Sequence, residues 1–193
     1  MQFESTLKSL KMRGLLTTQE LQKCLGVSQP TISRLVKNGA LRRFGHGLYA
    51  HPDWEIPPEE IDFAVACAKF GPTSAIGGLS ALFHYGLLDQ PPHQVWVVVS
   101  PKKADLNRFY RTLRTKTSIK HGIDTFKFYR ITSIERTLLE ALKFASKIGP
   151  RIAITAARTA LQKGLTSEKK LGETAQKLKL QAVLEKHWEA IVT

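Results

Sequence analysis

The chain has 193 residues, of which 42% are hydrophobic, and its formal net charge is +13. This length suits one domain of ordinary size plus a smaller one, and the hydrophobic content excludes a chain that is disordered throughout. No apolar run approaches the roughly 20 residues of a membrane span, and the first residues lack the apolar core of a signal peptide. Cys24 and Cys67 lie far apart in helical patterns, which predicts buried thiols in a cytoplasmic protein rather than a disulfide or a metal site.

The positive charge is distributed unevenly along the chain. Residues 1–50 carry 8 Lys/Arg and 2 Asp/Glu, residues 51–100 carry 1 and 6, and residues 101–193 carry 20 and 8. Two basic blocks therefore flank an acidic connector. Basic surfaces of this kind favour polyanions, and nucleic acid is the foremost of them. A membrane surface is the weaker alternative, since no strongly basic helix carries an aromatic insertion face.

Residues 18–41 have the pattern of two helices joined by a tight turn, and residues 3–13 precede them as a short amphipathic helix. Gly26 falls where the first helix must end, because glycine accepts the left-handed conformation that follows a helix. Ser28 and Pro30 suit the first turn of the second helix. The apolar residues that recur at helical spacing, and that we expect to form one small core, are Leu21, Leu25, Val27, Ile32, Leu35 and Val36.

The polar face of the second helix carries hydrogen-bonding residues and cations but no carboxylate. A helix that enters the major groove of DNA needs such residues, because acidic side chains would be repelled by the phosphates. An ordinary helical hairpin with a polar outer face is the alternative interpretation. The residues expected to contact DNA from the two helices are Thr18, Ser28, Gln29, Thr31, Ser33, Arg34 and Lys37.

A strand, a glycine turn and a second strand follow directly, over residues 41–50. A hairpin in this position is typical of a wing beside a recognition helix. Arg42, Arg43 and His46 would then meet phosphates or the adjacent minor groove. The sequence thus predicts a winged helix-turn-helix domain over residues 1–50.

Residues 51–58 contain three prolines and are predicted to be a linker, because proline cannot continue a helix or a central strand. Residues 59–193 are predicted to form a second, mixed domain with a small sheet and a helical C-terminal region, so that the whole chain is α+β. Its expected strands are 95–99 and several within 100–131, with 126–131 the clearest, and its expected helices cover 59–70, 73–88, 132–145, 151–163, 167–180 and 181–191. Glu135 is placed for a capping box with Thr132.

Cations alternate with apolar positions after residue 100, so one face of the small sheet is expected to be basic. Such a face is either simply solvated or a second contact to nucleic acid, which would add phosphate contacts but little sequence information. The residues of this possible second contact are Lys102, Lys103, Arg108, Arg111, Arg114 and Lys116.

Signals for catalysis or for a bound metal are weak. Ser80 lies in half of a nucleophile elbow, but Leu82 replaces the required second glycine, so a small residue at a helix contact is the better interpretation. His84 reads as a satisfied buried or interfacial histidine. The remaining histidines lack the spacing of a metal site, and no phosphate-binding glycine loop is present. We therefore expect neither a catalytic residue nor a cofactor.

Four stretches in this order resemble the AbiEi family, the antitoxins of type IV toxin–antitoxin pairs. They are RFGHGLYA at 43–50, SALFHYGL at 80–87, VWVVV at 95–99 and ITSIERTLLE at 131–140. In the second stretch, Tyr85 separates the histidine from the glycine, unlike the family pattern. The resemblance covers roughly residues 5–145, and the last fifty residues carry no matching motif.

The resemblance implies a bacterial autorepressor that binds inverted repeats in its own promoter. It also implies a functional partner, a nucleotidyltransferase-like toxin that the antitoxin opposes without a stable complex. A monomer or weak dimer is expected. Two other classes stay open: an enzyme or RNA-binding protein that uses the winged domain as an anchor, and a module that senses a protein or ligand through residues 73–88.

Overall fold

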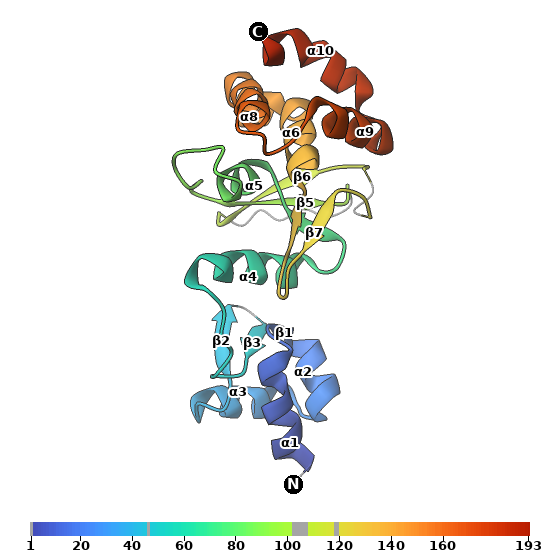
Figure 1. The fold of residues 1–193 in the computed structure, drawn as a ribbon. Coiled ribbons are helices and arrows are strands. Elements are labelled where there is room, and N and C mark those ends of the chain that lie inside the picture. Colours follow the sequence, from blue (N-terminus) through green and yellow to red (C-terminus); the bar gives the residue numbers. More distant parts are fainter. Residues whose placement is uncertain (1, 46, 102–107, 118–119) are drawn as a thin grey trace. The chain divides into compact units, whose positions relative to one another are not determined.

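The computed structural model describes residues 2–45, 47–101, 108–117 and 120–193, and the side chains of residues 2–4 and 8 are not described. The chain forms two compact units, Met1–Pro72 and Thr73–Thr193 (Figure 1). Both units combine helices with a small sheet, so the fold is α+β as predicted.

The N-terminal unit is a cluster of helices beside a three-stranded sheet. Its elements are α1 (Gln2–Ser9), η1 (Leu10–Met12), β1 (Leu16–Thr17), α2 (Thr18–Leu25), α3 (Gln29–Lys37), β2 (Arg42–Gly45), β3 (Leu48–Ala50), η2 (Pro58–Glu60) and α4 (Ile61–Phe70). The sheet has the order β1-β3-β2 and is antiparallel throughout. The predicted helix pair and hairpin are therefore present, and β1 adds a third strand that the sequence did not indicate.

Local sequence explains where α2 and α3 begin and end. Thr17 and Glu20 form a capping box, in which each side chain satisfies the other residue's backbone N–H. Gly26 adopts a left-handed conformation with φ of 65° and ends α2, as predicted. Ser28 is the N-cap residue of α3, although its hydroxyl lies 3.1 Å from the hydroxyl of Thr31 and accepts no backbone hydrogen bond.

The core of this unit is small, and its side chains come from η1, β1, α2, α3 and β3 and from Leu41 after α3. Its fully buried centre is formed by Leu10, Leu21 and Ile32, all 0% exposed. Leu16, Leu41 and Tyr49 complete it, and the partly buried Leu25, Val27, Leu35 and Val36 pack against it. The predicted apolar face of the two helices is thus confirmed.

The boundary between the units differs from the linker that the sequence predicts at residues 51–58. The N-terminal unit continues to Pro72, because α4 packs against β1 and β3. Trp54 is only 5% exposed, so this proline-rich stretch is held in place by an aromatic anchor. Pro58 begins η2 at the end of this stretch, and the compact unit continues beyond it to Pro72.

The second unit contains a five-stranded mixed sheet with the order β6-β5-β4-β8-β7. The strands are β4 (Ser74–Ile76), β5 (Val95–Val99), β6 (Tyr110–Arg114), β7 (Ile123–Thr125) and β8 (Arg130–Thr132). β5 is parallel to β6 and antiparallel to β4, and β4 is parallel to β8. The predicted strand at 95–99 is confirmed, and its residues from Trp96 onward are buried, as a continuous apolar run indicates.

Two predicted elements of this unit are wrong. The helix predicted over 73–88 is a strand, β4, followed by the shorter helix α5 (Gly78–His84). The clear strand predicted over 126–131 is mainly a turn between β7 and β8, closed by a hydrogen bond from the N–H of Phe126 to the carbonyl of Tyr129. The rings of these two residues stack with centroids 4.7 Å apart, which explains why an alternating aromatic pattern forms a turn here.

The remaining helices pack on one another and on the sheet. They are α6 (Ile134–Lys143), α7 (Ala145–Ile148), α8 (Pro150–Gln162), α9 (Glu168–Leu178) and α10 (Gln181–Val192). Figure 1 shows α6, α8, α9 and α10 on the same side of strands β5 and β6. Their common core joins Trp96, Val98 and Leu113 of the sheet to Leu138, Leu142 and the alanines of α8.

Candidate nucleic-acid interface

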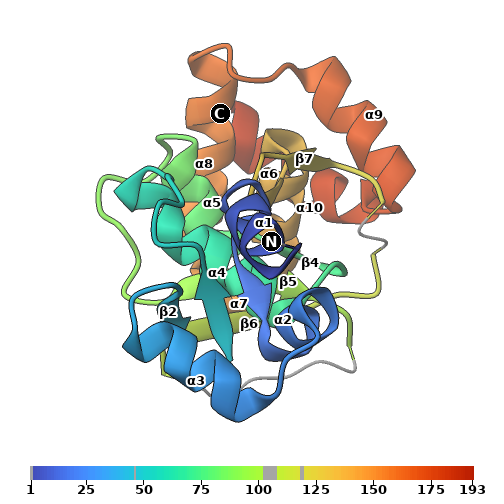
Figure 2. The ribbon, with the colours of Figure 1, turned by 90° about the horizontal axis from the view of Figure 1, so that it is seen from below.

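The outer face of α3 is the candidate interface of the N-terminal unit. Ile32 is fully buried and Leu35 and Val36 pack on the core, so they fix which side of the helix faces outward. Gln29, Ser33 and Lys37 follow one another at four-residue spacing, and all are exposed. Figures 1 and 2 show the ribbon of α3 beside strand β2 of the hairpin.

Some polar residues of α3 form hydrogen bonds within the helix, whereas its two cations do not pair with a carboxylate of the described residues. The Ser33 hydroxyl donates to the Gln29 carbonyl over 3.3 Å, and the Ser28 and Thr31 hydroxyls lie within 3.1 Å of each other. These short side chains are therefore partly engaged within the helix. Arg34 and Lys37 are exposed, and in the described part of the chain no carboxylate forms an ion pair with either of them. Their charge is available to an anionic partner.

The hairpin adds two exposed arginines that are held in different ways. The Nε–H of Arg43 donates to the carbonyl of Gly45 over 3.0 Å. The guanidinium carbon of Arg42 lies 4.7 Å from the ring centroid of Phe44, whose ring meets that of Trp54 edge to face at 5.2 Å. Stacking on an aromatic ring orients a guanidinium and leaves its N–H groups directed outward. The predicted contact His46 lies outside the described residues.

Thr18, the first residue of α2, connects this helix to the hairpin. Its backbone N–H donates to the carbonyl of Gly47 over 2.9 Å, which joins the first residue of α2 to the hairpin. Its side chain is half-buried, and a side chain added at Gly47 would lie 3.3 Å from the Thr18 hydroxyl. Glu20, the acidic residue of α2, is engaged in the capping box.

The predicted second contact lies in the other unit, and two of its described residues point to opposite faces of a strand. Lys102 and Lys103 lie outside the described residues. Arg111 and Arg114 are both exposed on β6 but are three residues apart, and side chains at that spacing point to opposite faces of a strand. Lys116 follows the strand and is exposed, and Arg108 lies over the ring of Phe109, with its guanidinium carbon 5.0 Å from the centroid. Arg111 and Arg114 therefore do not share a face, and a second contact to nucleic acid stays a prediction.

The residues considered for catalysis have structural partners. Ser80 is 2% exposed, and its hydroxyl accepts the backbone N–H of Trp96 over 2.9 Å, as expected of a residue at a helix contact. Glu135 accepts a hydrogen bond from the Thr166 hydroxyl over 2.9 Å, so the predicted capping box with Thr132 is wrong. The N-cap residue of α6 is Ser133, whose hydroxyl accepts from the N–H of Arg136.

His84 is exposed rather than buried, and it belongs to an aromatic cluster at the end of α5. Its ring meets Tyr85 edge to face at 5.1 Å and Phe126 at 5.8 Å. The Tyr85 hydroxyl lies 2.8 Å from the carbonyl oxygen of Thr132 and 3.0 Å from a carboxylate oxygen of Asp124. Burial, and secondarily the negative charge of Asp124, raises the pKa of the Tyr85 phenol well above its ordinary value. The cluster ties α5 to the β7–β8 hairpin.

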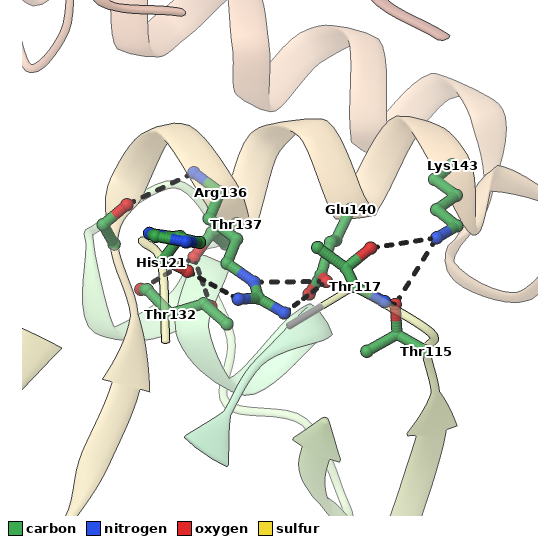
Figure 3. A network of polar contacts seen from close by, with 9 residues as sticks. Thr115, Thr117, His121, Thr132, Arg136, Thr137, Glu140 and Lys143 are labelled. Atoms are coloured by element: carbon green, nitrogen blue, oxygen red, sulfur yellow. Dashed lines mark hydrogen bonds and ion pairs between the residues drawn. The ribbon is translucent and has the colours of Figure 1, made fainter. Parts of the chain in front are cut away.

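A buried charged network in the second unit was not predicted from the sequence (Figure 3). Arg136 is 0% exposed and Glu140 is 1% exposed, and they form an ion pair with a distance of 3.0 Å. An Nη1–H of Arg136 also donates to the carbonyl of His121 over 2.6 Å. Their spacing of four residues on one helix is the signal that was present in the sequence, but such pairs are usually exposed.

The described residues contain neither a candidate metal site nor a candidate membrane span. No group of three or more His, Cys, Asp or Glu side chains in these segments is arranged to hold a metal ion. None of their helices is long and apolar enough to cross a membrane. Of the two cysteines, Cys67 is buried as predicted, whereas Cys24 is half-buried and its sulfur accepts a hydrogen bond from Arg13 over 2.9 Å.

Part of the N-terminal unit matches a known protein family in sequence. Residues 6–52 match a protein family described as transcriptional regulator, AbiEi antitoxin, which confirms the predicted resemblance over that segment. The matched segment contains α2, α3 and both strands of the hairpin.

Among solved structures, the chain is similar to the RV2827C protein from Mycobacterium tuberculosis, known from its crystal structure. The TM-score is 0.59 at 15% sequence identity, and the similarity covers 98% of this chain and 80% of that chain. At this identity the likeness concerns the fold, which both chains share over nearly the whole length of this one. No curated protein matches the sequence.

Proposed function

We propose that the N-terminal unit is a winged helix-turn-helix that binds double-stranded DNA, with α3 in the major groove. The observation that carries the proposal is the outer face of α3, which is exposed, free of carboxylates and flanked by two exposed arginines of β2. Gln29 at the helix start and Arg34 in the last turn would meet base edges, since these side chains form bidentate contacts with adenine and guanine. Lys37, Arg42 and Arg43 would meet phosphates.

We further propose that the protein represses its own promoter as the antitoxin of a type IV toxin–antitoxin pair. The match of residues 6–52 to regulators of the AbiEi antitoxin kind supports this proposal. In this function the protein acts in the cytoplasm on an operator with inverted repeats. A nucleotidyltransferase-like toxin would be its functional partner, without a stable complex between the two proteins. No cofactor takes part in this mechanism.

The physical mechanism has two parts. Contacts to phosphates release counterions, supply most of the affinity and make it depend on salt. Contacts from α3 to base edges supply the preference for the operator. Each half of an inverted repeat would receive one α3, so two copies of the protein are needed for a full operator.

The test is a gel-shift titration with the DNA directly upstream of the protein's own gene, against scrambled DNA of the same composition, at two salt concentrations. The expected result is a complex with the upstream DNA that is at least roughly 10³-fold tighter than that with scrambled DNA. Equal competition by scrambled DNA at both salt concentrations would overturn the proposal. Structured RNA, included as a third competitor, would reveal an RNA-binding protein if it displaced the operator.

A further inference from the structure

Helices α9 and α10 enclose an open groove of about 400 Å³ on the second unit. Its lining comprises Glu168 and Gly172 of α9 with Leu184, Glu185 and Trp188 of α10. Leu184 is 9% exposed and Trp188 is partly buried against the core, so they form an apolar base on which a side chain from outside can rest. The two glutamates are exposed.

Gly172 keeps this groove open. It lies in the interior of α9, where glycine lowers helix stability relative to alanine. A Cβ atom added at this position would meet nothing within 4 Å, so packing within the chain does not require a glycine here. A larger side chain would instead project into the groove. An incoming apolar group that approaches the helix closely is a physical reason for this residue.

The charge of the groove indicates which kind of group it accepts. Two carboxylates line it, on a chain whose formal net charge is +13. Carboxylates at this position repel phosphates, so nucleic acid is an unsuitable occupant. The matching group is an apolar side chain beside a cation, presented by a protein.

The same chain presents such a pair at the start of β6. Phe109 is 58% exposed, the guanidinium carbon of Arg108 lies 5.0 Å from its ring centroid, and neither side chain belongs to the candidate interface of the N-terminal unit. The backbone of the pair is fixed, because the Arg108 carbonyl accepts from the Gln94 amide over 2.8 Å and the Phe109 carbonyl from the N–H of Val95 over 3.0 Å. A fixed aromatic anchor loses little conformational entropy when it binds.

We propose that Phe109 and Arg108 of one copy of the chain dock into the α9–α10 groove of a second copy. Phe109 rests on Leu184 and Trp188 of the second copy, and Arg108 pairs with Glu185. Each copy carries both halves of the contact, so two copies can exchange it reciprocally. All of its residues belong to the second unit, whereas α3 and β2, which we propose to contact DNA, belong to the N-terminal unit.

The experiment is sedimentation equilibrium of the full chain without DNA, over a series of concentrations and at two salt concentrations. A monomer–dimer equilibrium that weakens at high salt is expected. Phe109→Ser and Gly172→Leu each raise the dissociation constant about 30-fold or more, as loss of a central anchor does. Phe126→Ser is the matched control, since Phe126 is also exposed, at 42%, but lies outside the contact; this variant associates like the parent.

A charge exchange makes the test independent of folding defects. Arg108→Glu and Glu185→Lys each weaken the dimer, and the double variant restores it, because the ion pair is re-formed with reversed sign. A parent chain that stays monomeric at every concentration overturns the proposal. A dimer that Phe109→Ser and Gly172→Leu leave intact, or a double variant no stronger than the single ones, also overturns it.

Discussion

Arg136 donates hydrogen bonds from its Nε–H and an Nη2–H to the same carboxylate oxygen of Glu140, over 3.2 and 3.0 Å (Figure 3). The other carboxylate oxygen, Oε2, is buried and has no hydrogen-bond partner among the described residues. The arrangement differs from the parallel two-oxygen pairing that arginine usually forms with a carboxylate. Oε1 of Glu140 therefore accepts two hydrogen bonds, whereas burial of Oε2 without a partner lowers the stability of the folded protein.

Removing one partner of this ion pair should destabilise the protein more than removing both. Arg136→Met or Glu140→Leu alone leaves an uncompensated buried charge, which costs on the order of 3–5 kcal/mol. The double variant leaves no charge, so its free energy of unfolding should lie closer to that of the parent than either single variant does. Urea unfolding of the four proteins measures the coupling. Additive losses in the double variant would contradict the expectation.

The network also predicts how stability changes with pH. Burial raises the pKa of the Glu140 carboxyl above its ordinary value of 4.5, although the charge of Arg136 acts in the opposite direction. The folded protein then binds this proton more tightly than the unfolded chain. The stabilisation linked to that proton is complete below pH 4.5 and is lost as the pH rises through the folded-state pKa.

Glu140→Gln isolates this contribution, because glutamine does not titrate. Unfolding free energies of parent and variant should be compared from pH 4.5 to neutrality, and the parent should lose stability relative to the variant as the pH rises. Parallel curves would show that Glu140 has the same pKa in the folded and unfolded states.

Arg34→Ala should reduce affinity for the operator and relax base preference, if α3 enters the major groove. Loss of a bidentate contact to a base costs about 1–3 kcal/mol of discrimination. Binding to a set of operators with single base changes measures the effect. One position in each half-site should become tolerant in the variant. Unchanged preference at every position would show that Arg34 does not read a base.

Lys37→Ala should weaken binding to all sequences alike. Loss of one phosphate contact lowers the slope of log K against log salt concentration by about one unit. The slope should be measured on operator and scrambled DNA. Lys186→Ala is the matched control, since Lys186 is an exposed lysine of α10 in the other unit and its loss changes the net charge equally. Equal slopes for the two variants would contradict the docking of α3.

Gly78→Ala should destabilise the second unit more than Gly86→Ala. Both glycines have positive φ, of 53° and 67°, and alanine is strained there by about 1–2 kcal/mol. Only at Gly78 would the new Cβ also lie 2.7 Å from Cε3 of Trp96, whereas at Gly86 it meets nothing within 4 Å. Overpacking adds about 1–3 kcal/mol. Urea unfolding measures both variants, and equal losses would show that Trp96 can move aside.

Local signals predicted the N-terminal unit well. Glycine and capping residues define the ends of α2 and α3 through interactions within a few residues, so the end of α2 at Gly26 could be predicted from sequence. Strand β4 could not, because Ser74–Ile76 is extended only through pairing with β5 and with β8, whose residue Ile131 lies far along the chain. The candidate interface could be predicted from the acid-free face of one helix.

Pairings over long sequence distances also explain the other errors. Nothing near Arg136 in the sequence indicates that its guanidinium is buried against the carbonyl of His121, fifteen residues away. The basic residues after position 100 were predicted to share one face, but the register of β6 places Arg111 and Arg114 on opposite faces. Sequence shows which residues are charged, whereas strand register determines which of them share a surface.

The hydrogen bond from Thr18 to Gly47 has a consequence for binding entropy. It fastens the hairpin that carries Arg42 and Arg43 to the first turn of α2, in addition to the pairing of β1 with β3. A free hairpin would lose backbone conformational entropy when a ligand orders it, at roughly 1–2 kcal/mol per residue. Here that loss occurs during folding. The two arginines thus reach any anionic partner on a strand that is already ordered, which favours affinity without a further contact.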